Sequence, residues 1–320
     1  MTAAFTALPA CVPLDLRCDT DRLTADPRSL QVRQRRLNRP ISSEGLMAEE
    51  LHDGRVLSIR APGGSPDRTD AGGPGMVGFA DAPWLARTPY FAEILAGIPA
   101  ELRAARLMAL GPGARVHEHR DGNLGMPRGR TRLHVPLVTN PGAVTVFEGR
   151  EYHREAGRLW YGDLGRPRYV ADRGEQTRIH LVIDCTVSLA LLKLFPPAFT
   201  DGLVWSEVLL SRDPVPLNLA EMARYRCRFP VPAAFLDWSQ DGCADDDLAA
   251  SIDVVAGELV FSVGDQPRFS LVHAGAGEFR PQGWTDERTI RPTDGTSRIR
   301  FLVRRGSSVR EWTRPAQRNS

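Results

Sequence analysis

The chain of 320 residues is very poor in lysine: Lys193 is the only lysine among 41 basic residues, so arginine supplies nearly all of the positive charge. We attribute this bias, together with the many alanine, glycine and proline residues, to GC-rich codon usage. Arginine also suits carboxylate binding better than lysine does, because its planar guanidinium can donate two parallel hydrogen bonds. The formal net charge of +2 is too small to indicate a nucleic-acid partner or an anionic membrane surface.

Long apolar runs and cysteine motifs are absent as well. No apolar stretch reaches the length of about 18 residues that a membrane-spanning helix needs. The first residues lack a basic segment ahead of an apolar one, so we expect no signal peptide. The five cysteines are odd in number and form no C-x-x-C pair, which predicts free thiols in place of disulfides or a zinc site. We therefore expect a cytoplasmic protein.

Short apolar segments separated by Gly, Pro, Asn and Asp dominate the rest of the chain. This spacing is typical of an antiparallel sandwich or barrel. A first group of strands is predicted at 56–60, 106–110, 131–139, 144–147, 158–161, 168–170 and 177–185, and a second group at 251–255, 258–263, 269–273 and 299–304. Short helices are predicted at 91–98, 186–195 and 217–225, and a Gly- and Pro-rich loop at 61–78 could act as a lid.

His119 and Asp121 form a His-x-Asp pair that follows a glycine-rich turn. Residues i and i+2 of a strand point to the same side, so the two side chains can meet one ligand. Two imidazoles and one carboxylate on one face are the ligands of non-haem iron(II) oxygenases. A lone His-x-Asp pair is common by chance, so this pair alone indicates little.

Arg178 and His180 share one face of a predicted strand whose other face carries Ile179 and Leu181. If that face lines the interior of a barrel, Arg178 needs an anion, which it can bind through two hydrogen bonds. If the face is exposed, Arg178 is an ordinary surface residue, and the pattern alone does not decide between these interpretations. Arg132 and His134 form a second pair of this kind, with the same two interpretations.

Further motifs stand in a fixed order with these residues, at 57–60, 88–91, 106–113, 119–121, 132–140, 157–160 and 178–184. Together they resemble the aspartyl/asparaginyl β-hydroxylase-like family of 2-oxoglutarate dioxygenases over residues 12–186. The resemblance implies a mainly β, double-stranded β-helix fold (jelly-roll or cupin-like) with flanking helices. It also implies iron(II) at His119 and Asp121, and 2-oxoglutarate held by Arg178, with His134 and Arg132 near its other carboxylate.

One position departs from the family. Residues 166–172 read RPRYVAD, where the family has a pattern like R-P-H-x-V-x-N. Arg168 thus stands where the distal metal-binding histidine is expected, and Asp172 stands where asparagine is usual. Arginine stays protonated and offers no lone pair, so it cannot bind iron. Metal occupancy is therefore in doubt.

Two consequences of Arg168 remain open. If its side chain turns inward and pairs with Asp121, the site is metal-free and the protein is a catalytically altered or metal-free pseudo-dioxygenase that binds a ligand or a partner. If it points away, iron is held by His119, Asp121 and 2-oxoglutarate, and the protein is an enzyme. We favour the enzyme because Asp121, Arg178 and His134 are all retained.

The sequence thus predicts a jelly-roll domain at 10–186, a helical connector at 187–228 and a small β domain of unknown role at 229–310. The predicted activity is hydroxylation of an amino acid, an amino-acid derivative or a peptide side chain, dependent on Fe(II) and 2-oxoglutarate. The small β domain could bind a protein partner.

Overall fold

The computed structural model describes residues 5, 7–29, 55–238, 246–293 and 297–318, and their contacts divide the chain into two units. Unit 1 comprises residues 1–72 and 79–208, and unit 2 comprises residues 73–78 and 209–320. The predicted connector at 187–228 is shared between the units, since its first part contacts unit 1 and its remainder contacts unit 2.

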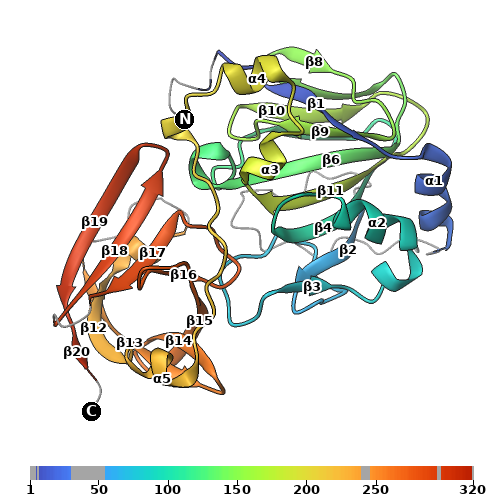
Figure 1. Cartoon of the computed structure of the whole chain (residues 1–320). Coiled ribbons are helices and arrows are strands. Elements are labelled where there is room, and N and C mark those ends of the chain that lie inside the picture. The colour runs from blue at the N-terminus through green and yellow to red at the C-terminus, as the bar shows by residue number, and fades with distance from the viewer. Residues whose placement is uncertain (1–4, 6, 30–54, 239–245, 294–296, 319–320) are drawn as a thin grey trace. The chain divides into compact units, whose positions relative to one another are not determined.

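Unit 1 contains a seven-stranded sheet and a four-stranded sheet (Figure 1). The first runs in the order β1 (Cys11–Arg17), β9 (Arg158–Gly162), β6 (Arg130–Val138), β11 (Arg178–Thr186), β4 (Leu102–Leu110), β2 (Arg55–Pro62) and β3 (Phe79–Asp81). The second runs in the order β5 (Arg115–His119), β10 (Arg168–Asp172), β7 (Ala143–Phe147) and β8 (Arg150–Tyr152).

The strand order is that of a double-stranded β-helix. Strands β4 to β11 alternate between the sheets except for the β7–β8 hairpin, so that β9, β6, β11 and β4 are neighbours in one sheet and β5, β10, β7 and β8 in the other. Every pair of neighbouring strands in both sheets is antiparallel. The predicted jelly-roll fold and its strands at 106–185 are confirmed.

Both faces of β6 and β11 are buried, but their two faces differ in chemistry. Leu133, Val135 and Leu137 form the apolar face of β6, while Arg132 and His134 point to the opposite side. Strand β11 repeats the pattern, with His134 opposite Val182 and Arg132 opposite Asp184 in the pairing register. One face of the sheet is therefore an ordinary core, and the other carries buried charge.

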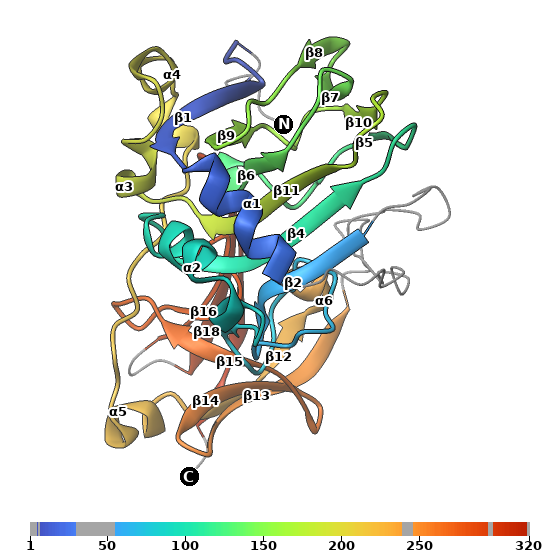
Figure 2. The same ribbon diagram turned by 90° about the vertical axis from the view of Figure 1, so that its right-hand side faces the viewer.

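Helices flank the seven-stranded sheet, where α1 and α2 lie against it (Figure 2). Helix α2 begins at Pro89, whose fixed φ suits the first helical position, and buries Phe91, Ile94 and Leu95 along one side. The helical segments of unit 1 are α1 (Thr20–Ser29), α2 (Pro89–Ala96), α3 (Leu189–Leu192) and α4 (Pro197–Asp201), with 3₁₀ turns η3 (Leu85–Arg87), η4 (Met126–Arg128) and η5 (Trp205–Glu207). No helix among the described residues is long and apolar enough to cross a membrane.

Unit 2 is a meander in which each strand from β12 to β19 pairs with the next. The last strand, β20, follows β19 in the chain and pairs with β12 at the other end of the meander, so the sheet nearly closes. Phenylalanine rings, including Phe229, Phe261 and Phe301, pack in its core. Its strands are β12 (Cys227–Pro232), β13 (Asp247–Val255), β14 (Glu258–Val263), β15 (Gln266–His273), β16 (Phe279–Pro281), β17 (Arg288–Pro292), β18 (Arg298–Arg305), β19 (Ser308–Pro315) and β20 (Gln317–Arg318), with helices α5 (Leu219–Ala223) and α6 (Ala233–Leu236).

The first two residues of the loop expected at 61–78 belong to β2, so the loop runs from residue 63 to the start of β3, and its residues 73–78 belong to unit 2. There the Gly75 amide donates to the Gln282 carbonyl at 3.0 Å, and the Ser270 amide donates to the Gly75 carbonyl at 3.2 Å. The second half of the loop is thus hydrogen-bonded to unit 2. A lid role for this loop stays a prediction.

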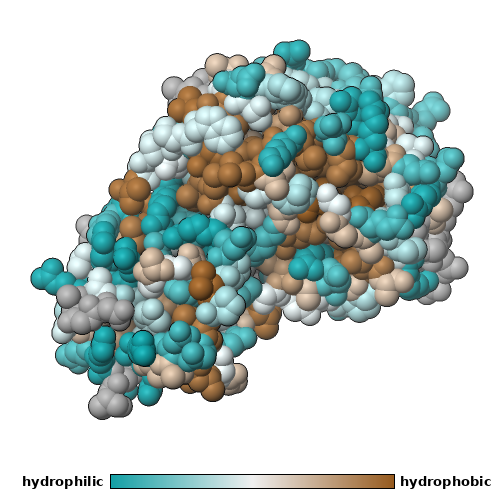
Figure 3. All heavy atoms as spheres, in the orientation of Figure 1, coloured by the Kyte–Doolittle hydropathy of each residue, from teal (hydrophilic) through white to brown (hydrophobic). Residues whose placement is uncertain are grey.

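Hydrophobic side chains gather on the face of unit 1 that Figure 3 shows. Trp205 of η5 is 49% exposed. The cysteines are free thiols as predicted at the four described positions, while Cys243 lies outside the described residues.

Candidate functional site

His119 is the last residue of β5, and Asp121 lies in the turn that follows. The Asp121 amide stabilises this turn by donating to the Leu164 carbonyl at 2.9 Å. Asp121 is fully buried, and the His119 side chain is 18% exposed. His119 Nδ1 lies 2.7 Å from the His117 carbonyl oxygen, which accepts its proton and leaves the lone pair on Nε2. Nε2 lies 3.8 Å from Asp121 Oδ1, an oxygen with no hydrogen-bond partner among the described residues.

Arg168 begins β10 directly opposite His119 and turns inward. Its Nη2 donates to Asp121 Oδ2 at 2.7 Å and its Nη1 donates to the Leu164 carbonyl at 2.8 Å. Burial alone would raise the pKa of Asp121, but Arg168 and then Arg132 hold it below its ordinary value. Burial, followed by the charge of Arg168, lowers the pKa of His119. The imidazole is therefore held neutral, as metal binding requires.

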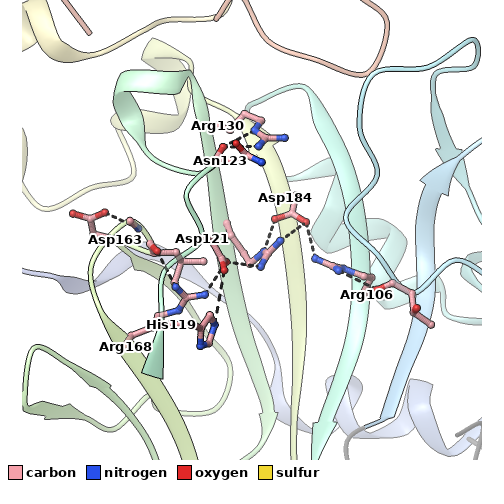
Figure 4. Close-up of polar contacts among 12 residues, drawn as sticks. Arg106, His119, Asp121, Asn123, Arg130, Asp163, Arg168 and Asp184 are labelled. Atoms are coloured by element: carbon pink, nitrogen blue, oxygen red, sulfur yellow. Dashed lines mark hydrogen bonds and ion pairs between the residues drawn. The ribbon is translucent and has the colours of Figure 1, made fainter. Parts of the chain in front are cut away.

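A chain of alternating buried charges extends from Arg168 into the seven-stranded sheet (Figure 4). Arg132 Nη1 donates to Asp121 Oδ2 at 3.0 Å, and Arg132 Nε donates to Asp184 Oδ1 at 2.6 Å. Arg106 Nη2 then donates to Asp184 Oδ2 at 2.8 Å. Arg132 thus bridges two carboxylates, and its guanidinium is engaged by protein groups.

A second polar cluster forms around Arg178 on the same face of β11. Arg178 Nε donates to His180 Nε2 at 3.0 Å, and the His134 ring lies edge-on to the His180 ring with centroids 5.8 Å apart. Burial, and then the neighbouring Arg154, lowers the pKa of Arg178 to about 9. Burial likewise lowers the pKa of His134 and of His180 well below the ordinary value, so both imidazoles are neutral. A neutral pair beside two guanidiniums forms a surface suited to an anion.

The residues fit a divalent metal in part. His119 Nε2 carries a lone pair, and Asp121 Oδ1 has no hydrogen-bond partner among the described residues. The two atoms face each other, so both can be ligands of one metal ion. The third implied position holds the Arg168 guanidinium, which has no lone pair to give. Within the described ranges, no three His, Cys, Asp or Glu side chains are grouped as metal ligands.

All five residues singled out from the sequence lie in unit 1 on elements that border one buried region. They fall into two groups: His119, Asp121 and Arg132 in the ion-pair chain, and His134 and Arg178 in the second cluster. Sequence reasoning missed Asp184, although it alternates with His180 on the strand that was already singled out. It also missed Arg154, which follows β8 in a segment without periodicity and carries no pattern signal.

The strand order and the buried polar face define a double-stranded β-helix protein with a polar interior site. Residues 78–187 match the family Aspartyl/Asparaginyl beta-hydroxylase. This match includes every residue of both polar clusters.

The individual proteins that this chain resembles match it over a short segment or at low sequence identity. An L-proline cis-4-hydroxylase of Rhizobium meliloti (strain 1021) is 31% identical over 83 residues, which are 26% of this chain and 29% of that protein. The prolyl-4-hydroxylase of Pseudomonas putida is similar over 57% of this chain and 94% of that one, at 16% identity and a TM-score of 0.34. A non-heme monooxygenase in complex with nickel is similar over 57% of this chain and 76% of that one, at 14% identity and a TM-score of 0.35. Because these scores are low, the fold assignment rests on the strand order.

Proposed function

We propose that unit 1 is an Fe(II)- and 2-oxoglutarate-dependent oxygenase that hydroxylates an amino acid, an amino-acid derivative or a peptide side chain. The observation that carries this proposal is the pairing of His119 Nε2 with Asp121 Oδ1, two atoms that face each other at 3.8 Å. The family match over residues 78–187 and the proline-hydroxylating relative support the same chemistry.

Iron(II) would be held by His119 and Asp121. When bound, it supplies oxygen activation, with 2-oxoglutarate as the reductant that is converted to succinate and carbon dioxide. The protein holds the reactants: Arg178 binds a carboxylate of 2-oxoglutarate, His180 fixes the Arg178 guanidinium through its hydrogen bond, and His134 borders the same site. Arg168 does turn inward to Asp121, the arrangement expected above to leave the site metal-free, but Arg168 and Arg132 both donate to Oδ2 and leave Oδ1 open to a metal ion. The two arginines also keep Asp121 ionised, so Oδ1 stays a ligand atom at neutral pH.

One specific observation favours a second candidate, a metal-free protein that binds an organic anion. The Arg168 guanidinium lies 2.7 Å from Asp121 and can balance the carboxylate charge in place of a metal ion. In that protein the cluster around Arg178 would bind the ligand, and no oxygen chemistry would follow. The family match and the relatives give this candidate no support of their own.

Iron binding and succinate formation test the two candidates. We expect wild type to bind Fe(II) at one site and to form succinate from 2-oxoglutarate, and Arg168→His to bind the metal more tightly because it adds an imidazole ligand. Arg168→Met is the matched control, since it removes the same cation without adding a ligand. If only Arg168→His binds iron and forms succinate, the metal-free candidate is correct.

A further inference from the structure

We infer that Arg154 is a second carboxylate-binding arginine of this site, which acts with Arg178 on the same carboxylate of 2-oxoglutarate. This inference rests on the proposed function and deepens it by adding a co-substrate-binding residue. Arg154 comes from the segment between β8 and β9, so the two guanidiniums come from different parts of the chain.

Arg154 is a buried arginine flanked by exposed residues. It is only 4% exposed, whereas His153 and Glu155 on either side of it are exposed. Its Nε and Nη2 atoms have no hydrogen-bond partner among the described residues. A buried guanidinium normally has such partners, because leaving an unpaired charge out of water costs several kcal/mol.

Arg166 shows what a structural buried arginine of this protein is like. It is also 4% exposed, but its Nε donates to Asp163 at 3.0 Å, and its Nη2 donates to the Leu8 carbonyl at 2.8 Å. Its Nη1 also reaches Glu148 at 3.3 Å. The guanidinium of Arg166 is thus hydrogen-bonded within the protein, whereas Nε and Nη2 of Arg154 have no acceptor among the described residues.

Gly162 makes room for Arg154 on the polar face of the seven-stranded sheet. A Cβ atom at Gly162 would lie 2.8 Å from Arg154 Nη2, closer than real Cβ contacts allow. Gly162 and Trp160 share one face of β9, and Trp160 is the pairing partner of His134 on β6. The Arg154 guanidinium therefore lies over the same sheet face as His134.

Arg154 and its neighbour His134 have buried nitrogen atoms without a hydrogen-bond partner among the described residues. Neither nitrogen of His134 has a hydrogen-bond partner, and the side chain of Arg178 hydrogen-bonds to the neutral His180 alone among the described residues. Within the described residues, no ion pair joins Arg154 or Arg178 to an Asp or Glu side chain. Burial, and then the charge of Arg154, lowers the pKa of His134 and of Arg178, while the charge of Asp172 raises the pKa of Arg178. Arg154 and Arg178 are therefore close enough to repel each other. A carboxylate placed among them removes this repulsion and uses the free donors.

The test measures 2-oxoglutarate binding by calorimetry, and melting temperature, on the full chain without metal and in the presence of chelator. Arg154→Met should weaken 2-oxoglutarate binding on the order of 10- to 100-fold, because hydrogen bonds to a charged group are lost. The same variant should raise the melting temperature of the ligand-free protein, since an unpaired buried charge is removed. Arg154→Lys should bind with intermediate affinity. Arg150→Met is the matched control: it removes an exposed arginine of β8 and should change neither quantity.

The outcomes separate this inference from the proposed function. If Arg154→Met binds 2-oxoglutarate as tightly as wild type, or if wild type binds none, the inference is wrong. A fall in both affinity and ligand-free melting temperature would make Arg154 a structural residue and would also overturn it. If wild type binds 2-oxoglutarate through Arg154 but forms no succinate with iron, the inference stands and the oxygenase proposal fails.

Discussion

The Arg168 guanidinium donates from Nη2 to Asp121 Oδ2 at 2.7 Å, from a strand position directly opposite His119. The two oxygens of Asp121 therefore have different surroundings. Oδ2 accepts from Arg168 and from Arg132, while Oδ1 faces His119 without another described partner. One carboxylate thus serves as an ion-pair partner on one side and remains a potential ligand on the other.

The coupling of Arg168 and Asp121 can be measured by a double-mutant cycle. Arg168→Met and Asp121→Asn should each destabilise the protein, because each leaves a buried charge with fewer partners. The double variant should be less unstable than the sum, with a coupling energy of about 2 kcal/mol in urea unfolding. Additive effects would mean that the two side chains do not contact each other in solution.

Arg132 should contribute far more to stability than an exposed ion pair of similar geometry. Arg132→Met leaves Asp121 and Asp184 buried with one fewer cation each, so we expect a loss of about 3–5 kcal/mol in the free energy of unfolding. The control is Arg300→Met, which breaks an exposed pair with Glu311 and should cost less than about 1 kcal/mol. Equal losses in urea unfolding would contradict this ranking.

Stability should fall as the pH is lowered from about 7 to 5. Burial, reinforced by Arg154 at His134 and by Arg178 at His180, lowers the pKa of both imidazoles well below 6.5. The unfolded chain takes up these protons near pH 6.5 and the native state does not. Each histidine should therefore lower the free energy of unfolding by about 1.4 kcal/mol per pH unit below that point.

Urea unfolding at several pH values checks this slope, and staying at pH 5 or above avoids titrating the carboxylates. The double variant of His134→Asn and His180→Asn should show a shallower slope than wild type. Equal slopes would show that neither imidazole is the source of the pH dependence.

The β13–β14 turn of unit 2 offers a stabilising substitution. Ala256 has φ 51° and Gly257 has φ 84°, and a two-residue turn with both φ values positive favours Asn-Gly. Ala256→Asn should stabilise the protein by up to about 1 kcal/mol, because alanine is strained in the left-handed region. Ala256→Val should destabilise it, since a branched side chain tolerates this region less well. Chemical unfolding of the full chain measures both, and an opposite order would contradict the turn geometry.

Local pattern was enough for much of the fold. Alternating residues in β6 and β11 and the Gly- and Pro-rich turns between short strands predict an antiparallel sandwich or barrel, because side chains two apart on a strand share a face. The jelly roll within that class was implied by the family resemblance. Helix α2 follows from apolar residues at helical spacing after Pro89. The pairing of β20 with β12, which nearly closes the sheet of unit 2, had no such signal, because it joins strands far apart in the chain.

The sequence by itself determined which residue types stand at the site: His119, Asp121, Arg178, and an arginine at position 168 in place of a histidine. Only the tertiary structure decided what each of them contacts. Arg168 turns inward to Asp121, and Arg132 is shared between Asp121 and Asp184. Arg154, which no local pattern singled out, lies buried close to Gly162. These outcomes depend on burial and on partners from distant strands, since a charge taken out of water is stabilised by whichever opposite charge the fold brings beside it.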